Sequence, residues 1–90
     1  MEKFLIEDIS NNLGEQKIYR FDNDYGASVI RNIGSYGFSR KLWEIAVLFF
    51  DGKDVDITYN TPITDGVIGC LNWEDVENIL SQIEKLEAQE

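Results

Sequence analysis

The chain contains no histidine, a single cysteine and a single proline among its 90 residues. Without histidine it lacks the commonest general base and a common transition-metal ligand, so the composition favours a protein that is not an enzyme. Cys70 cannot form an intramolecular disulfide, and its neighbours Ile68 and Leu71 predict a buried filler rather than a nucleophile. We therefore predict no catalytic residue and no cofactor.

Long apolar runs are also missing. The longest, Ile45 to Phe50, has the length of a strand, whereas a membrane-spanning helix needs about 18 apolar residues. The N-terminus, Met1 to Phe4, lacks the basic leader and apolar segment of a secretory signal. The sequence therefore predicts a cytoplasmic protein with no membrane partner.

Basic residues are scarce, with 8 Lys and Arg against 17 Asp and Glu and a formal net charge of −9. Acids are nevertheless absent from residues 25–43, where Arg31, Arg40 and Lys41 lie. This segregation predicts a surface with two electrostatic faces that suit opposite partners.

The hydrophobic fraction of 43% and aromatic fraction of 12% are globular values, and residues 1–90 are long enough for one domain. Alternation and turn residues predict a hairpin of Gln16–Asp22 with Ala27–Arg31, and a central strand over Trp43–Phe50. A turn at Asp51–Asp54 would then lead into a return strand over Val55–Tyr59. Phe4–Ile9 is ambiguous, and Ile63–Leu71 is interpreted as a connecting segment.

A C-terminal helix is predicted from Asn72, which is a good N-cap, to about Leu86 or Ala88. Glu74 and Asp75 lie in its first turn, where the helix dipole favours acids. The fold class is therefore α+β, an antiparallel four- to five-stranded sheet with this helix packed on one face. The predicted core is Val29, Ile45, Val47, Phe49, Ile57, Val67, Leu71, Val76, Ile79, Leu80 and Ile83.

Three carboxylates gather at Asp51, Asp54 and Asp56. Oxygen-rich clusters suit Mg²⁺ or Ca²⁺, but the spacing of a calcium loop is absent and Asp51-Gly52 is sufficient as turn chemistry. We interpret them as a solvated hairpin tip and predict no metal site.

The acid-free segment is the first candidate binding site. Its cations and aromatics could pair with phosphates and stack on bases of a single strand, or could dock onto a protein. A third interpretation is that the aromatics pack on the sheet and the cations balance nearby acids. The candidate residues are Arg31, Tyr36, Phe38, Arg40 and Lys41.

The acidic helix is the second candidate. Glu77, Glu84 and Glu87 should point away from its apolar stripe and form a negative ridge. Such a ridge could imitate backbone phosphates and occupy a basic groove, although a solvated polar face is the ordinary role of such residues.

Two blocks carry a family resemblance: YGASVIR, SYG and LWEIAVL between Tyr25 and Leu48, and YNTPITDGVIG from Tyr59 to Gly69. Together they resemble a family of small uncharacterised bacteriophage proteins. The resemblance implies a phage or prophage origin and expression in the cytoplasm of a host bacterium, and it carries over no catalytic residue.

These observations predict a small acidic, non-enzymatic phage protein that binds and inhibits a host protein, such as a defence nuclease or a nucleic-acid-binding factor. Two alternatives stay open. One is a single-stranded nucleic-acid-binding accessory that uses Arg31 to Lys41. The other is a structural or oligomeric phage component, because an uncovered sheet face drives self-association.

Overall fold

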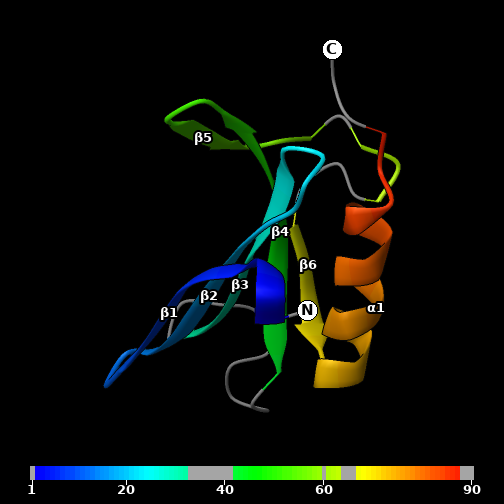
Figure 1. Cartoon of the computed structure of the whole chain (residues 1–90). Coiled ribbons are helices and arrows are strands. Elements are labelled where there is room, and N and C mark those ends of the chain that lie inside the picture. The colour runs from blue at the N-terminus through cyan, green and yellow to red at the C-terminus, as the bar shows by residue number, and fades with distance from the viewer. Residues whose placement is uncertain (1, 33–41, 60, 64–66, 88–90) are drawn as a thin grey trace.

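The computed structural model describes residues 2–32, 42–59, 61–63 and 67–87. It confirms the α+β fold: an antiparallel sheet with one C-terminal helix packed on it (Figure 1). A short 3-10 turn, Glu2–Phe4, precedes the sheet. The strands are β1 (Leu5–Asn11), β2 (Gly14–Arg20), β3 (Tyr25–Asn32), β4 (Trp43–Asp51), β5 (Asp54–Ile57) and β6 (Val67–Leu71), and the helix is α1 (Trp73–Glu84).

Strand β4 is the central strand of the sheet and pairs with β3, β5 and β6. The strands follow the order β1-β2-β3-β4-β5, and β6 also pairs with β4. One edge of β4 pairs with β3, while its other edge is divided: β6 lies opposite its first half, from Trp43 to Ala46, and β5 opposite its last part, from Leu48 to Asp51. The segment predicted as a connection, Ile63–Leu71, thus ends in a strand that local alternation did not indicate.

The two predicted hairpins are present. β2 pairs with β3 in a register that places Ile18 opposite Ser28, and β4 pairs with β5 through the turn at Gly52. Gly52 has a φ of +61°, a backbone conformation that glycine adopts without steric cost. The Asp51-Gly52 turn seen in the sequence therefore suits the β4–β5 hairpin.

The helix begins where the sequence predicts. The Asn72 side chain accepts a hydrogen bond from the backbone N–H of Asp75 at 2.8 Å, as an N-cap does. Val76, Leu80 and Ile83 form the buried stripe, and Ile79 packs beside them. The helix ends at Glu84, slightly before the predicted end. Within the described residues, no helix is long and apolar enough to cross a membrane.

The core lies between α1 and one face of the sheet. Predicted core residues Val29, Ile45, Val47 and Leu71 are buried there, and Phe49 is partly buried. This layer also contains five buried residues that the sequence pattern did not predict as core, namely Tyr19, Phe21, Tyr25, Ala27 and Trp43.

Two core predictions are wrong: Ile57 is 41% exposed and Val67 is 43% exposed. Both belong to strands at the margin of the sheet, and the register places their side chains on the face away from α1. Cys70, expected to be buried, is exposed. Its φ of 59° and the shifted register of the β4–β6 pairing interrupt the alternation of β6 at this residue.

Candidate protein-docking face

The two faces of the sheet have different surroundings. Successive side chains of a strand point to opposite faces, so Ile45 and Val47 of β4 face α1 while Leu48 and Phe50 face the other way. Figure 1 shows α1 on one side of β4, and β5 and the β1–β2 hairpin extending toward the opposite side. We call this second side the open face.

A hollow of about 410 Å³ lies on the open face. Flat neighbouring strands are spaced by about 4.8 Å, so β1 and β5 could not line one hollow unless the sheet curled. The curl turns the two outer strands into walls, and we call the hollow between them the trough. It is lined by Ile6 and Glu7 of β1, Gln16 and Ile18 of β2, Ser28 of β3, Leu48 and Phe50 of β4, and Val55, Asp56 and Ile57 of β5.

The floor of the trough is packed. Leu48 and Phe50 are buried, and the Phe50 ring lies against Gly26, where an added Cβ would come within 2.7 Å of its Cε2. The Arg20 guanidinium lies over this ring, 4.8 Å from its centroid, and pairs with Asp24 at 3.4 Å. The floor is therefore a fixed apolar surface.

The walls expose large aliphatic side chains. Ile6 is 58% exposed and Val55 is 48% exposed, and Ile57 stands beside Val55 on the same wall. Ile57 is 41% exposed, so each of the three remains about half exposed among the residues that the structure describes. A contiguous exposed apolar surface of this kind is typical of an interaction site.

The polar groups of the trough are few. Gln16 donates a hydrogen bond from Nε2 to Ser28 Oγ at 3.3 Å, so these two partly satisfy each other. The charged lining residues are both acids, Glu7 on β1 and Asp56 on β5, but the register sets Asp56 opposite Phe49, so its carboxylate points to the other face of the sheet. Neither takes part in a salt bridge within the described part of the chain, where the pairs are Lys17–Asp8, Arg20–Asp24 and Arg31–Glu15.

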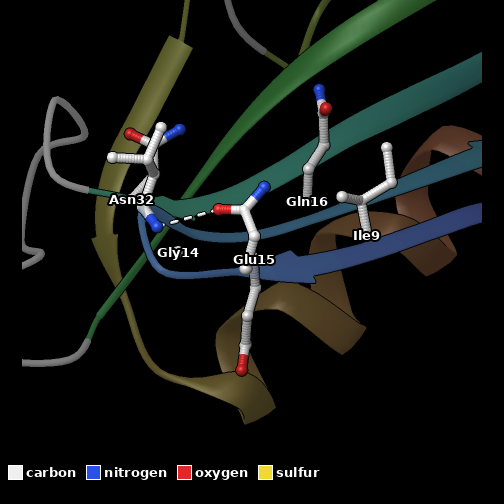
Figure 2. A pocket seen from close by; sticks show the side chains of 7 residues that line it. Ile9, Gly14, Glu15, Gln16 and Asn32 are labelled. Carbon is white, nitrogen blue, oxygen red and sulfur yellow. Dashed lines mark hydrogen bonds between the residues drawn. The ribbon is translucent and has the colours of Figure 1, made fainter.

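The open face continues toward the β1–β2 turn. A smaller hollow of about 170 Å³ lies there and shares Gln16 with the trough. Figure 2 shows Ile9 and Gln16 projecting from the same side of the two strands while Glu15 points to the other side. Ile9 is 40% exposed, so the apolar surface extends beyond the trough along β1.

The hairpin carboxylates lie on the other face of the β4–β5 pair from the trough. Asp56 is opposite Phe49 in the register, whereas Val55 and Ile57 are opposite Phe50 and Leu48. A third hollow, about 380 Å³, is lined by Asp51, Asp54 and Asp56 together with Phe49 and Val55. Asp51 and Asp54 are opposite each other in the register of β4 and β5. Among the described residues, no three acidic or cysteine side chains are placed to hold a metal ion together. The hairpin therefore places its negative charges on the side of β5 that faces away from the trough.

Of the five candidate binding residues in the acid-free segment, Arg31 is the one that falls within the described ranges. Its guanidinium donates to Glu15 at 3.0 Å and lies 4.4 Å from the centroid of the Trp43 ring. The Arg31 charge is thus used within the domain, on the face of the sheet that α1 covers. Tyr36, Phe38, Arg40 and Lys41 lie outside the described residues.

The predicted acidic ridge of α1 is on the opposite side of the sheet from the trough. Glu77 is exposed and accepts a hydrogen bond from Trp73 Nε1 at 2.9 Å. Glu87 is exposed and Glu84 is half-buried. The structure therefore does not bring these acids together with the open face.

One titratable group of the helix side has a shifted pKa. Burial raises the pKa of the Tyr19 phenol, and the negative charges of Glu77, Asp8 and Glu2 raise it further. This tyrosine is 3% exposed in the core and is therefore neutral at physiological pH, as a packing residue.

The trough was missed by the sequence analysis because its residues are distant in the chain. Alternation at Val55 and Ile57 predicted a half-buried strand, but no local signal indicated which face of the sheet lacks a helix.

Comparisons with protein-family models, with curated proteins and with solved structures find no match to this chain. An inference about the function of this protein therefore rests on its fold and its open face.

Proposed function

We propose that the chain is a non-enzymatic binding protein that docks onto another protein through its open face. The observation that supports this most directly is the trough itself. It combines a packed floor of Leu48 and Phe50 with exposed walls that carry Ile6, Val55 and Ile57. Sheets bury their apolar faces against a second layer, and on this face the described residues supply none.

The energetic gain from docking is appreciable. Fully burying an aliphatic side chain yields about 1.5–3 kcal/mol, so covering a half-exposed one yields about 1 kcal/mol. The three exposed wall side chains together provide a few kcal/mol, and aromatic rings such as Phe50 often anchor interfaces.

The resemblance to bacteriophage proteins supports a more specific proposal about the origin of the protein and the kind of partner it binds. We propose a phage protein that acts in the cytoplasm of the host bacterium and inhibits a host protein, for example a defence nuclease or a nucleic-acid-binding factor. The acid surplus supports a partner with a basic surface, because complementary charge speeds encounter and selects the correct partner.

Binding to single-stranded nucleic acid is the competing function. It would rely on Arg31, Arg40 and Lys41, yet Arg31 already pairs with Glu15 and stacks on Trp43. A chain of net charge −9 also repels phosphates. The arrangement of Arg31 therefore favours protein docking over nucleic-acid binding.

The test is site-specific photo-crosslinking in bacterial lysate. A photoreactive amino acid at Val55 should capture one defined partner, and the same probe at Tyr59, which is 55% exposed outside the trough lining, should not. Capture should be lost when Ile57→Asn is added. Equal capture from both probes, or none from Val55, would contradict docking at the trough.

Two further experiments distinguish docking at the trough from docking through the acidic ridge and from binding of nucleic acid. Charge reversal at Glu77 and Glu87 should leave capture from Val55 unchanged, since these acids lie across the sheet. If reversal abolishes capture, the acidic ridge is the docking surface. Fluorescence titration with short single strands should show no binding at low salt; tight binding that is lost on Arg40→Ala and Lys41→Ala would establish the nucleic-acid function instead.

A further inference from the structure

We propose that two copies of this chain associate through the outer edge of β1 and form one continuous antiparallel sheet with a two-fold axis at Ile9. The proposal goes beyond docking at the trough and does not depend on it. Because the axis is perpendicular to the sheet, both open faces lie on the same side of the dimer and each trough stays accessible.

Strand β1 has the longest edge without a neighbour among the described residues. It stands first in the order β1-β2-β3-β4-β5, six of its seven residues are exposed, and it contains neither Pro nor Lys, which commonly block an edge. Figure 1 shows it as the outermost strand of a hairpin that extends away from α1. The edges of β5 and β6 are less suitable, because β5 has four residues, two of them acids, and the Cys70 φ of 59° interrupts β6.

The backbone of β1 directs the polar groups of Asp8 and Ser10 outward. Asn11 and Gly14 pair across a turn of two residues, so they form the hydrogen-bonded pair that closes the β1–β2 hairpin. Hydrogen-bonded pairs alternate along an antiparallel ladder, so the backbone groups of Ile9 face β2 while those of Asp8 and Ser10 face away. A second β1 can therefore pair with these two residues without disturbing the hairpin.

The sequence of β1 is complementary to itself about Ile9. With the axis at this residue, Glu7 lies opposite Asn11 of the second copy and Asp8 lies opposite Ser10, so each acid meets a hydrogen-bond donor. The Asn11 Oδ1 already accepts a backbone hydrogen bond within the turn at 2.8 Å, which leaves its Nδ2 to donate to Glu7. Ile9, which is 40% exposed, meets its own counterpart. An interface between two copies across a two-fold axis requires this kind of self-complementarity.

Charge selects this register over one centred on Asp8. An axis at Asp8 sets the two Asp8 carboxylates opposite each other, and like charges directly opposite destabilise a sheet. With the axis at Ile9, each Asp8 faces a serine and stays paired with Lys17 of its own chain at 2.9 Å. Opposite residues of one sheet share a face, so an axis between two residues of β1 is excluded.

The interface is small, so the association is weak. Residues 7–11 of each copy bury less area than a standard interface, and net charges of −9 repel each other. We expect a dissociation constant on the order of 100 µM. It should fall about two- to fivefold when salt is raised from about 50 mM to about 500 mM, because salt screens the repulsion.

The direct test is a disulfide across the axis. In a Cys70→Ser background, which removes the exposed thiol, Ile9→Cys should form a disulfide dimer with oxidised glutathione. Opposing residues of a non-hydrogen-bonded pair have Cα atoms about 4.5 Å apart, which suits a disulfide. Leu13→Cys is the control, because Leu13 is 64% exposed but the two copies of it lie at opposite ends of the interface. We expect Ile9→Cys to crosslink about tenfold faster or more.

A proline variant tests the backbone pairing. The β1–β2 ladder does not use the Ser10 N–H, so Ser10→Pro should stay folded by circular dichroism and should exclude a second strand. Sedimentation at up to about 1 mM should show the natural chain rising from the monomer mass toward twice that mass, while Ser10→Pro stays monomeric. Ser10→Ala keeps the N–H and should weaken association by about threefold or less.

Several results would overturn the inference. These are a natural chain that stays monomeric at about 1 mM, equal crosslinking of Ile9→Cys and Leu13→Cys, and a dimer that Ser10→Pro leaves intact or that Ile57→Asn dissociates. If Ser10→Pro does not fold, the comparison of the two cysteine variants decides alone.

The docking function is tested separately from the dimer. If the dimer forms while the probe at Val55 captures no partner, docking at the trough is wrong and the dimer stands. If the probe captures a defined partner while the chain stays monomeric, the dimer is wrong and docking stands.

Discussion

The side chain of Asn23 closes the last turn of α1 by donating from Nδ2 to the carbonyl of Ile83 at 2.9 Å. The same nitrogen lies within hydrogen-bonding distance of the carbonyls of Glu84, at 3.2 Å, and Leu86, at 2.8 Å. Its Oδ1 accepts from the backbone N–H of Tyr25. A residue of the β2–β3 turn thus donates to carbonyls at and just beyond the C-terminal end of α1, where Ile83 also accepts from the backbone N–H of Leu86.

Replacing Asn23 should loosen the end of the helix. Asn23→Ala removes several hydrogen bonds to partly buried carbonyls, so we expect a loss of about 2 kcal/mol in the free energy of unfolding. Urea denaturation would measure it. Asn12→Ala, at an exposed turn position, is the matched control and should change little; similar losses in both variants would show that Asn23 does not hold the helix.

Gly26 should be essential for the floor of the trough. A Cβ at this position would lie 2.0 Å from the backbone oxygen of Tyr19, which cannot move independently of β2. We expect Gly26→Ala to cost about 3 kcal/mol of stability and to shift the Phe50 ring. Gly52→Ala is the comparison: its Cβ would meet nothing within 4 Å, so only the φ of +61° opposes it, at about 1 kcal/mol. A larger loss at Gly52 would contradict this account.

Tyr19 should make the protein sensitive to alkali. Because burial first, and the charges of Glu77, Asp8 and Glu2 second, raise its pKa above 10.0, the folded chain retains a proton that the unfolded chain releases. Its contribution to stability is therefore fully present below pH 10 and is lost as the pH rises through the folded-state pKa. Denaturation at neutral and alkaline pH should show a steeper decline in the natural chain than in Tyr19→Phe. If the natural chain and Tyr19→Phe lose stability equally as the pH rises, Tyr19 is not the cause of the sensitivity to alkali.

Arg31 should stabilise the domain through its planar guanidinium. The group lies over Trp43 at 4.4 Å and pairs with Glu15 at 3.0 Å, a combination that lysine cannot reproduce. We expect Arg31→Lys to cost about 1 kcal/mol, measured by thermal unfolding with Lys53→Arg as an exposed control. If the variant is as stable as the natural chain, the contact of Arg31 with Trp43 and Glu15 contributes little to stability. Arg31 would then be available to bind a partner.

The sequence was informative wherever a short segment determines its own structure. Asn72 caps the helix, the stripe containing Val76 and Leu80 is buried, and Asp51-Gly52 makes a turn, because each depends on neighbours within a few residues. Trp43–Phe50 was predicted as the central strand because it is continuously apolar from Ile45 onward, and β4 spans Trp43–Asp51.

The pairing of strands that are distant in the chain could not be predicted from local sequence patterns. Val67 and Ile57 have core-like composition, yet β6 and β5 divide one edge of β4 and project these side chains onto the open face. Nothing in the local pattern of Ile63–Leu71 indicates that half an edge is vacant. The trough depends on the same kind of information, since Ile6 and Val55 line one hollow only through the curl of the sheet.

Strand β4 presents Val47 to the helix and Leu48 to the trough, so adjacent residues of one backbone hold both layers. A partner that binds the folded form alone lowers the population of unfolded chains, and here its contact would fall on the central strand itself. The abundance of this protein in a cell would then rise and fall with that of its partner, since unfolded chains are removed by proteases.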